Sequence, residues 1–149
     1  MLFDLSACVS PDSWTPPVPG IQFAPVTFNL DFMANCPSDK RPIWREFDFQ
    51  AQIPNSSTIV FVAQTADTSS GLTAAQSAPL ATATSSTALP NWDVAIVDTT
   101  TSGAFQKVNP PLVSKNYLRV ATTLTPTTDL KASPTLLNWE VHYDCVFSQ

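Results

Sequence analysis

The chain has 149 residues, of which 44% are hydrophobic and 13% are charged, and its formal net charge is −5 at pH 7. Single domains commonly contain about 100–150 residues, so the length predicts one domain. The hydrophobic fraction is too high for a disordered chain, and 14 Pro with 3 Gly argue against a helical bundle. The acidic balance argues against nucleic acid as a partner, because binding a phosphate backbone requires clustered Lys and Arg.

The N-terminal segment and the composition of the chain indicate where the protein is located and how its domains are organised. No apolar stretch approaches the ~20 residues of a membrane-spanning helix, so we expect no membrane span. The segment MLFDLSACV lacks the basic start and continuous apolar run of a signal peptide. Because the Thr-, Ser- and Pro-rich composition is typical of surface-exposed β proteins, we expect a part of a larger secreted protein rather than a cytosolic one. Residues 1–24, rich in Pro, predict an extended linker or the tail of a preceding module, and residues 25–149 predict the folded domain.

Period-2 alternation of apolar and polar residues predicts most of the secondary structure. Arg45 falls on the apolar face of its strand, which indicates a local bulge that would change the facing of Trp44. Residues 66–90 predict a long loop with a short helical turn and one weak strand. The sequence therefore predicts an all-β protein, an antiparallel β-sandwich of jelly-roll or immunoglobulin-like type. Its expected strands are residues 25–32, 43–53, 58–64, 92–97, 117–124 and 139–147.

The three cysteines predict one disulfide. Cys36 follows the first predicted strand and Cys145 lies near the end of the last. Because the first and last strands of a sandwich commonly neighbour one another, we expect these two to form a bridge rather than two buried thiols. Cys8 is left over, and an odd cysteine in a secreted chain indicates a partner outside the domain. The spacings match no structural zinc pattern.

Three segments resemble a known family. They are CPSDKRPIWREFDFQAQIP (36–54), NYLRVATTLTPT (116–127) and SPTLLNWEVHYDCV (133–146). Together they resemble the all-β domain near the C-terminus of large delta-proteobacterial surface proteins, among them PilY1/PilC-type proteins associated with the tip of type IV pili. The shared positions are Cys36, Arg41, Pro42 and Trp44 in the opening strand, and Pro134, Leu136, Trp139, Tyr143 and Cys145 in the closing strand.

This resemblance covers about residues 25–149. It implies an extracellular, non-enzymatic adhesion or assembly module whose partners are pilus or surface proteins. The central loop at residues 66–90 has no counterpart in it.

Residues suited to catalysis are sparse. His142 is the one histidine, and a spacing of about 6.5–7 Å along a strand predicts no direct hydrogen bonds to Glu140 or Asp144. A solvated or cross-strand-paired His142 is therefore expected. Glu46 and Glu140 would form a glycosidase-type pair only if their strands were neighbours. We expect no catalytic residues, no metal ligands and no cofactor, and calcium held by Asp-bearing loops, such as those of Asp67 and Asp129, stays an open alternative.

Outward aromatic residues indicate a binding face. Trp44 falls on the polar face of its strand, and Tyr117 lies beside Arg119 on the polar face of a later one. Exposed aromatics stack against sugar rings or anchor a protein partner, and the alternative is that they pack under the N-terminal segment or the long loop. Trp139 and Tyr143 are predicted core residues. Besides the adhesion module, a glycan-binding module of a secreted enzyme and a ligand-free spacer remain alternatives.

Overall fold

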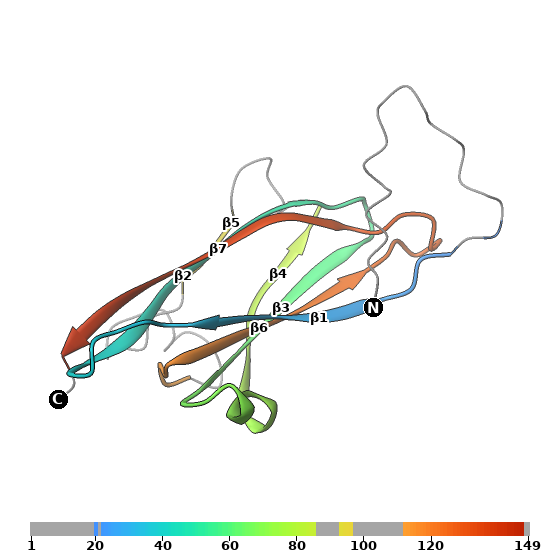
Figure 1. Ribbon diagram of the computed structural model, residues 1–149. Helices are drawn as coiled ribbons and strands as arrows, with labels where there is room; N and C mark the ends of the chain where they lie inside the picture. The colour runs from blue at the N-terminus through green and yellow to red at the C-terminus, as the bar shows by residue number, and fades with distance from the viewer. Residues whose placement is uncertain (1–19, 21, 86–92, 97–111, 148–149) are drawn as a thin grey trace.

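The computed structural model describes residues 20, 22–85, 93–96 and 112–147, and within 93–96 it describes the backbone alone. The described residues form seven β-strands and one short 3₁₀ helix, η2 (Figure 1). In chain order they are β1 (Val26–Met33), β2 (Lys40–Gln52), β3 (Thr58–Ala66), η2 (Ser70–Ala74), β4 (Ser77–Thr84), β5 (Asp93–Ile96), β6 (Tyr117–Thr125) and β7 (Thr135–Phe147). Within these ranges no helix has the length and apolar character needed to cross a membrane.

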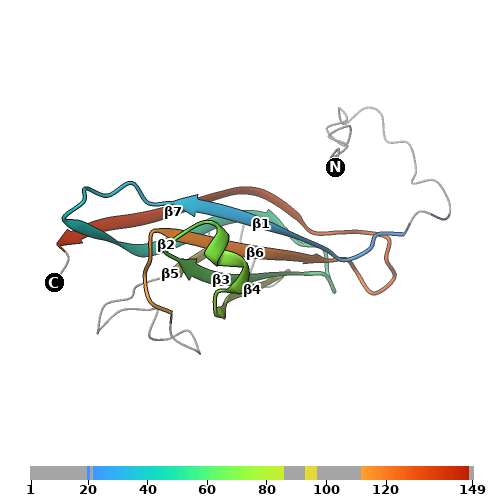
Figure 2. The same ribbon diagram turned by 60° about the horizontal axis from the view of Figure 1, so that its bottom comes forward.

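The strands form two antiparallel sheets packed face to face (Figure 1, Figure 2). One sheet has the order β1-β6-β3-β4 and the other has the order β5-β2-β7. Among the described strands, only β3 and β4 are both consecutive in the chain and paired with each other. The other consecutive strands lie in different sheets, so both sheets are built from strands far apart in the sequence. The predicted all-β sandwich is confirmed.

The alternation patterns locate the strands to within a few residues. β1, β3 and β6 begin within one residue of their predicted starts. β2 and β7 begin earlier than predicted, because they pair with each other through residues 40–42 and 135–138, whose sequence does not alternate between apolar and polar. The expected helical turn and weak strand of residues 66–90 appear as η2 and β4. Cys8 and most of the expected N-terminal lead lie outside the described residues.

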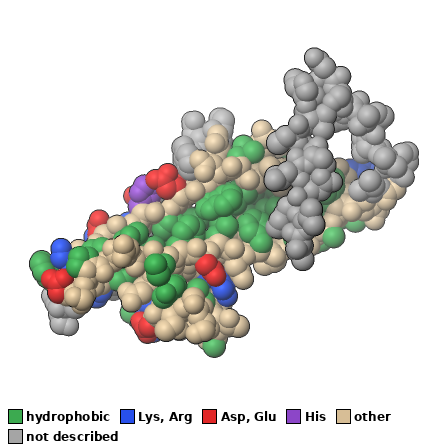
Figure 3. Space-filling model, viewed as in Figure 1, with side chains coloured by type: hydrophobic (Ala, Val, Ile, Leu, Met, Phe, Trp, Pro, Cys, Tyr) green, Lys and Arg blue, Asp and Glu red, His purple; other side chains and the backbone are tan. Residues whose placement is uncertain are grey.

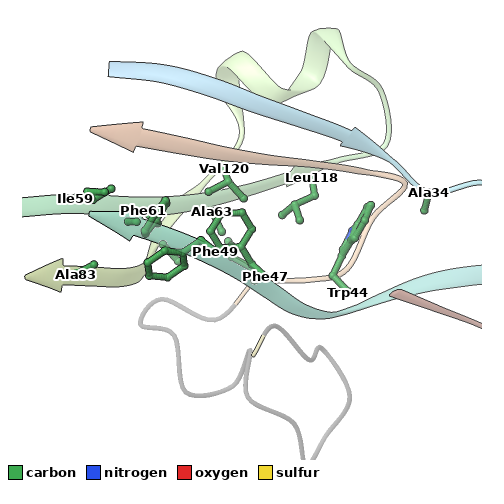
Figure 4. Packing of buried hydrophobic residues seen from close by; sticks show 13 residues of the cluster. Ala34, Trp44, Phe47, Phe49, Ile59, Phe61, Ala63, Ala83, Leu118 and Val120 are labelled. Carbon is green, nitrogen blue, oxygen red and sulfur yellow. The ribbon is translucent and has the colours of Figure 1, made fainter. Parts of the chain in front are cut away.

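Aromatic rings from both sheets form the centre of the core (Figure 4). Phe47 and Phe49 of β2 face Phe61 of β3, with ring centroids 5.1 and 4.5 Å from that of Phe61. Leu118 and Val120 of β6 pack in the same cluster, on the inward face predicted for them. Burying a large apolar side chain contributes roughly 1.5–3 kcal/mol. These residues therefore supply much of the attraction between the sheets.

A β-bulge at Arg45 determines which residues of β2 face the core. The pairing of β2 with β7 shifts between Trp44 and Glu46, so Arg45 is the extra residue. Trp44 and Phe47, on either side of the bulge, therefore both point into the core, and both are at most 1% exposed. The bulge predicted from Arg45 is confirmed. The Arg45 side chain itself is partly exposed and pairs with Asp144, with Nε 2.8 Å from Oδ2.

The two predicted core residues of β7 differ in their outcome. Tyr143 is half-buried and its ring lies 5.2 Å from that of Trp44. Trp139 was expected in the core, but its side chain is 40% exposed. Trp139 lies opposite the buried Phe49, yet β7 is an edge strand of its sheet. No neighbouring strand of the described structure covers its outer flank, and that position explains the exposure.

Candidate functional site

A disulfide joins Cys36 to Cys145, as expected. Cys36 lies in the connection from β1 to β2, and Cys145 lies on β7 opposite Pro42. The first and last strands are not paired with each other, because β1 and β7 are edge strands of different sheets. The bridge instead ties the two sheets together where the chain crosses between them. Beside it, the backbone N–H of Asn35 donates a hydrogen bond of 3.1 Å to the Tyr143 hydroxyl.

Trp44, the first residue of the expected binding face, lies in the core. Its indole Nε1 donates to the carbonyl of Lys115 at 2.8 Å, and its backbone N–H donates to the Ser114 hydroxyl at 3.0 Å. A side chain with 1% exposure cannot stack on a sugar ring. The expectation of an exposed Trp44 is therefore wrong, and its physical reason is the bulge at Arg45, which reverses the facing of the strand before it.

Tyr117 and Arg119 lie on the outer face of the other sheet. The Arg119 guanidinium donates two hydrogen bonds of 2.7 Å to the carboxylate of Asp31. The Gln64 side chain, opposite Arg119, donates to the carbonyl of Ala75 at 3.0 Å and so holds the end of η2 near this face. Figure 2 shows η2 in front of β3 and β6. Tyr117 and Arg119 are thus separated from Trp44 by a sheet, and the three do not form one surface.

A group of ligand-type side chains lies on the outer face of the β2–β7 pair. Glu46 lies opposite His142, and Asp48 lies opposite Glu140. His142 Nε2 is 2.9 Å from Glu140 Oε1 and 3.3 Å from Asp48 Oδ2. One ligand atom each of Glu46, Asp48 and His142 lie within 4.8 Å of one another. We call these four residues the carboxylate–histidine cluster, and Figure 3 shows the histidine in purple beside acidic side chains in red.

The contacts of His142 correct one expectation and confirm another. The sequence predicted no direct contact between His142 and Glu140, because their backbones are spaced too widely along the strand. The contact forms because both long side chains project from one face and lean toward each other. The expected cross-strand pairing of His142 is found, with Asp48 as the partner. The sequence signal for this cluster was the pair of alternating motifs Glu46-x-Asp48 and Glu140-x-His142, which become neighbours only once β2 pairs with β7.

The cluster differs from a glycosidase centre in its setting. Glu46 and Glu140 do lie on neighbouring strands, which was the condition for such a pair. Glycoside hydrolysis, however, places two carboxyl groups on either side of a bound sugar. Here the side chains of His142 and Glu140 are 46% and 57% exposed on an open sheet face. The arrangement is suited to holding an ion or a proton, and it does not enclose a substrate.

A pocket of about 360 Å³ opens at one end of the sandwich. It lies between the end of β3, η2 and residues 112–115. Lys115 at its wall pairs with Asp67, with Nζ 3.0 Å from Oδ2. Asp67, one of the acidic residues considered for calcium, therefore has a cationic partner.

Asp129, the other loop residue considered for calcium, is held within its own turn. Its Oδ1 accepts hydrogen bonds from the Thr127 hydroxyl at 2.6 Å and from the Lys131 N–H at 3.1 Å. These hydrogen bonds, the one from Thr127 above all, lower the pKa of Asp129 below 3.8. The carboxylate thus serves to fix the turn before β7.

Core-facing side chains are left half-exposed along one side of the sandwich. Leu30 and Phe32 of β1 lie opposite Val120 and Leu118, which are at most 1% exposed. Their own exposure is much greater because β1 has no further strand beyond it among the described residues. Figure 3 shows hydrophobic side chains gathered along the middle of this face. We call this surface the apolar edge, and its members are Val26, Leu30 and Phe32 of β1 and Leu136, Trp139 and Val141 of β7.

The β7 residues of the apolar edge are also more exposed than the residues that lie opposite them. Val141 lies opposite Phe47, and Leu136 lies opposite Ala51. Both partners are buried, whereas Val141 and Leu136 are only half-buried. The disulfide places the end of β7 beside the connection that follows β1, so the two edge strands lie on the same side of the domain (Figure 2). The apolar edge is therefore a continuous surface across both sheets.

Comparison of the chain with protein-family models, curated proteins and solved structures found no match. The fold defines the class of the protein as an antiparallel, disulfide-bridged β-sandwich.

Proposed function

We propose that this domain is a non-catalytic, extracellular interaction module of a bacterial surface or type IV pilus-associated protein, as its resemblance to the PilY1/PilC-type domain implies. The observation that carries the proposal is the apolar edge. Exposed apolar surface rimmed by polar residues is typical of protein–protein contact sites. Among the described strands, β1 and β7 are each paired on one side alone, and the unpaired side of an edge strand can accept an added strand. The partner is therefore a protein that contributes an extended apolar segment.

The disulfide supports an extracellular location. Structural disulfides persist in oxidising compartments, such as the periplasm and the cell surface, and are rare in the cytosol. Cys36 and Cys145 are bridged and join the two sheets, which is a structural rather than a redox-active placement.

Binding to purified pilin and minor pilin subunits tests this function. We expect the full chain to bind at least one subunit, and Val26→Ser or Trp139→Ser to weaken binding at least ~10-fold, since buried apolar anchors dominate most interfaces. Val113→Ser is the matched control, because Val113 is exposed and lies on neither edge strand. Binding that all three variants retain equally would contradict a role for the apolar edge.

The two alternatives give different results in the same assay. A glycan-binding module would bind immobilised glycans and no pilin, but Trp44, one of the two aromatic residues expected to form its platform, is buried. A ligand-free spacer would bind neither pilins nor glycans. Either result would overturn the proposed protein partner.

A further inference from the structure

The carboxylate–histidine cluster brings together the donor atoms of a metal site. Directly opposite residues on antiparallel strands have Cβ atoms about 4.5–5.5 Å apart. The pairs Glu46–His142 and Asp48–Glu140 are adjacent on one face. They therefore place three carboxylates and one imidazole at the corners of a small quadrilateral. The bulge at Arg45 sets this register, because it advances Glu46 to the position opposite His142.

Asp48 carries an unpartnered oxygen within this cluster. Its side chain is 17% exposed, and its Oδ1 is buried with no hydrogen-bond partner among the described residues. A buried acceptor without a partner costs about 1–3 kcal/mol, and more when it is charged. Glu46 and Glu140 add two further negative charges nearby. A divalent cation bound at Asp48 Oδ2 would offset the charge of this carboxylate, whose other oxygen is unpaired, and the repulsion between the carboxylates.

We propose that the cluster binds a divalent transition-metal ion, with Glu46, Asp48 and His142 as ligands and Glu140 within reach as a fourth. An imidazole nitrogen combined with carboxylate oxygens suits Zn²⁺ and its first-row neighbours, whereas Ca²⁺ and Mg²⁺ prefer oxygen ligands alone. Zn–N and Zn–O bonds of 2.0–2.2 Å place tetrahedral ligand atoms about 3.4 Å apart. The 3.3 Å between His142 Nε2 and Asp48 Oδ2 is close to that separation.

The spacing of the side chains already approximates a coordination shell. His142 Nε2 lies 2.9 Å from Glu140 Oε1 and 3.3 Å from Asp48 Oδ2. With the ion bound, the lone pair of Nε2 forms the bond to the metal, and the neutral imidazole keeps its one proton on Nδ1. The Glu46 carboxylate, already within 4.8 Å, approaches by rotation of its side chain. The site is independent of the apolar edge, and its test does not depend on a protein partner.

The single histidine makes the test direct. Zn²⁺ is titrated into the full chain carrying Cys8→Ser, which removes the one thiol outside the disulfide, while the imidazole resonances are followed by NMR. Because His142 is the one histidine of the sequence, its signals need no assignment. We expect a saturable shift with Zn²⁺, reversed by EDTA, and none with equal Ca²⁺ or Mg²⁺. An imidazole that Zn²⁺ leaves unchanged would overturn the proposal.

Substitution of the carboxylate ligands distinguishes a metal site with several ligands from Zn²⁺ binding to His142 alone. Asp48→Asn and Glu46→Gln remove one charged ligand each while keeping a similar shape, and we expect each to weaken Zn²⁺ binding at least ~10-fold. Asp144→Asn is the matched control, because Asp144 is an exposed carboxylate of β7 that pairs with Arg45 instead. We expect it to bind Zn²⁺ as the parent does. Equal affinity in all variants would show adventitious binding to the imidazole and would refute the site.

Discussion

Arg119 and Asp31 lie directly opposite each other on β6 and β1 and are joined by two hydrogen bonds of 2.7 Å. Bidentate pairs of this kind are stronger and more directional than single ion pairs. The Arg119 side chain is 16% exposed, so its charge is held near the sheet rather than in bulk water. The pair therefore fastens the edge strand β1, and with it the β1 part of the apolar edge, to the interior of its sheet.

This pair predicts an acid-sensitive contribution to stability. The hydrogen bond from Arg119 lowers the pKa of Asp31 below its ordinary value of 3.8. A carboxyl group with a lowered folded-state pKa stabilises the fold above the unfolded pKa and loses that effect as pH falls through the folded value. We expect Arg119→Gln to raise the pKa of Asp31 toward 3.8 and to flatten the pH dependence of unfolding in that acid range.

Side-chain carboxyl NMR titration of Asp31, with unfolding curves at matched pH values, measures both effects. Arg45→Gln serves as the control, because it removes an arginine that pairs with Asp144 on the opposite sheet. The same Asp31 pKa in the parent and in Arg119→Gln would contradict the assignment.

The disulfide predicts a large loss of stability on reduction. Cys36 and Cys145 are 109 positions apart, and in the chain-entropy model a loop of about 100 residues corresponds to about 4–5 kcal/mol. We expect the double variant Cys36→Ser, Cys145→Ser to lose stability of that order in denaturant unfolding. Cys8→Ser is the control and should leave the unfolding midpoint unchanged. Peptide mapping of the parent protein under non-reducing conditions should find the 36–145 linkage, and three free thiols after oxidative folding would contradict it.

The two tryptophans of the β2–β7 pair are expected to contribute very different amounts to the free energy of unfolding. Trp44 is 1% exposed and hydrogen-bonded through its indole, whereas Trp139 is 40% exposed. Truncating a fully buried tryptophan to alanine typically costs about 3–5 kcal/mol. We therefore expect Trp44→Ala to destabilise the domain by that amount and Trp139→Ala to cost roughly 1–2 kcal/mol. Equal losses, measured by chemical denaturation, would show that the facing of β2 is not as described.

A core position on the other sheet tests the packing between the two sheets. Phe61 of β3 contacts Phe47 and Phe49 across the interface. We expect Phe61→Leu to be tolerated better than Phe61→Ala, which should cost about 3–5 kcal/mol because it leaves a cavity. Val60, the neighbouring residue with its side chain on the other face, provides the control through Val60→Ala, which should cost less. A loss at Val60 equal to that at Phe61 would contradict the assignment of the core face.

Local patterns in the sequence predicted the strands well, because alternation is a property of consecutive residues. Leu118 and Val120 were assigned to the core in this way and are buried. The bulge could also be predicted from Arg45, because burying an unpaired charge on the apolar face of a strand costs free energy. The bulge also implied a changed facing for Trp44, but its position relative to Trp44 depended on the register between β2 and β7, which consecutive residues do not encode.

The candidate site was harder to predict because it depends on which strands are neighbours. The sequence suggested that Glu46 and Glu140 could form a pair if their strands were neighbours. No local pattern indicated that Asp48 and His142 would lie in contact beside them. Strand order is set by long-range packing, and the order of these two sheets joins strands from opposite ends of the chain. The exposure of Trp139 could not be predicted for the same reason, because it follows from the position of β7 at the edge of its sheet.

The cross-link between Cys36 and Cys145 also determines how the domain would carry mechanical load. Tension applied between the two ends of the chain would enter through β1 and pass from one sulfur to the other. Nearly all of the residues from β2 to β7 lie inside the loop that the bridge closes. The backbone within that loop would carry none of the end-to-end tension, so stretching would peel β1 from β6 but could not extend the chain between the two cysteines.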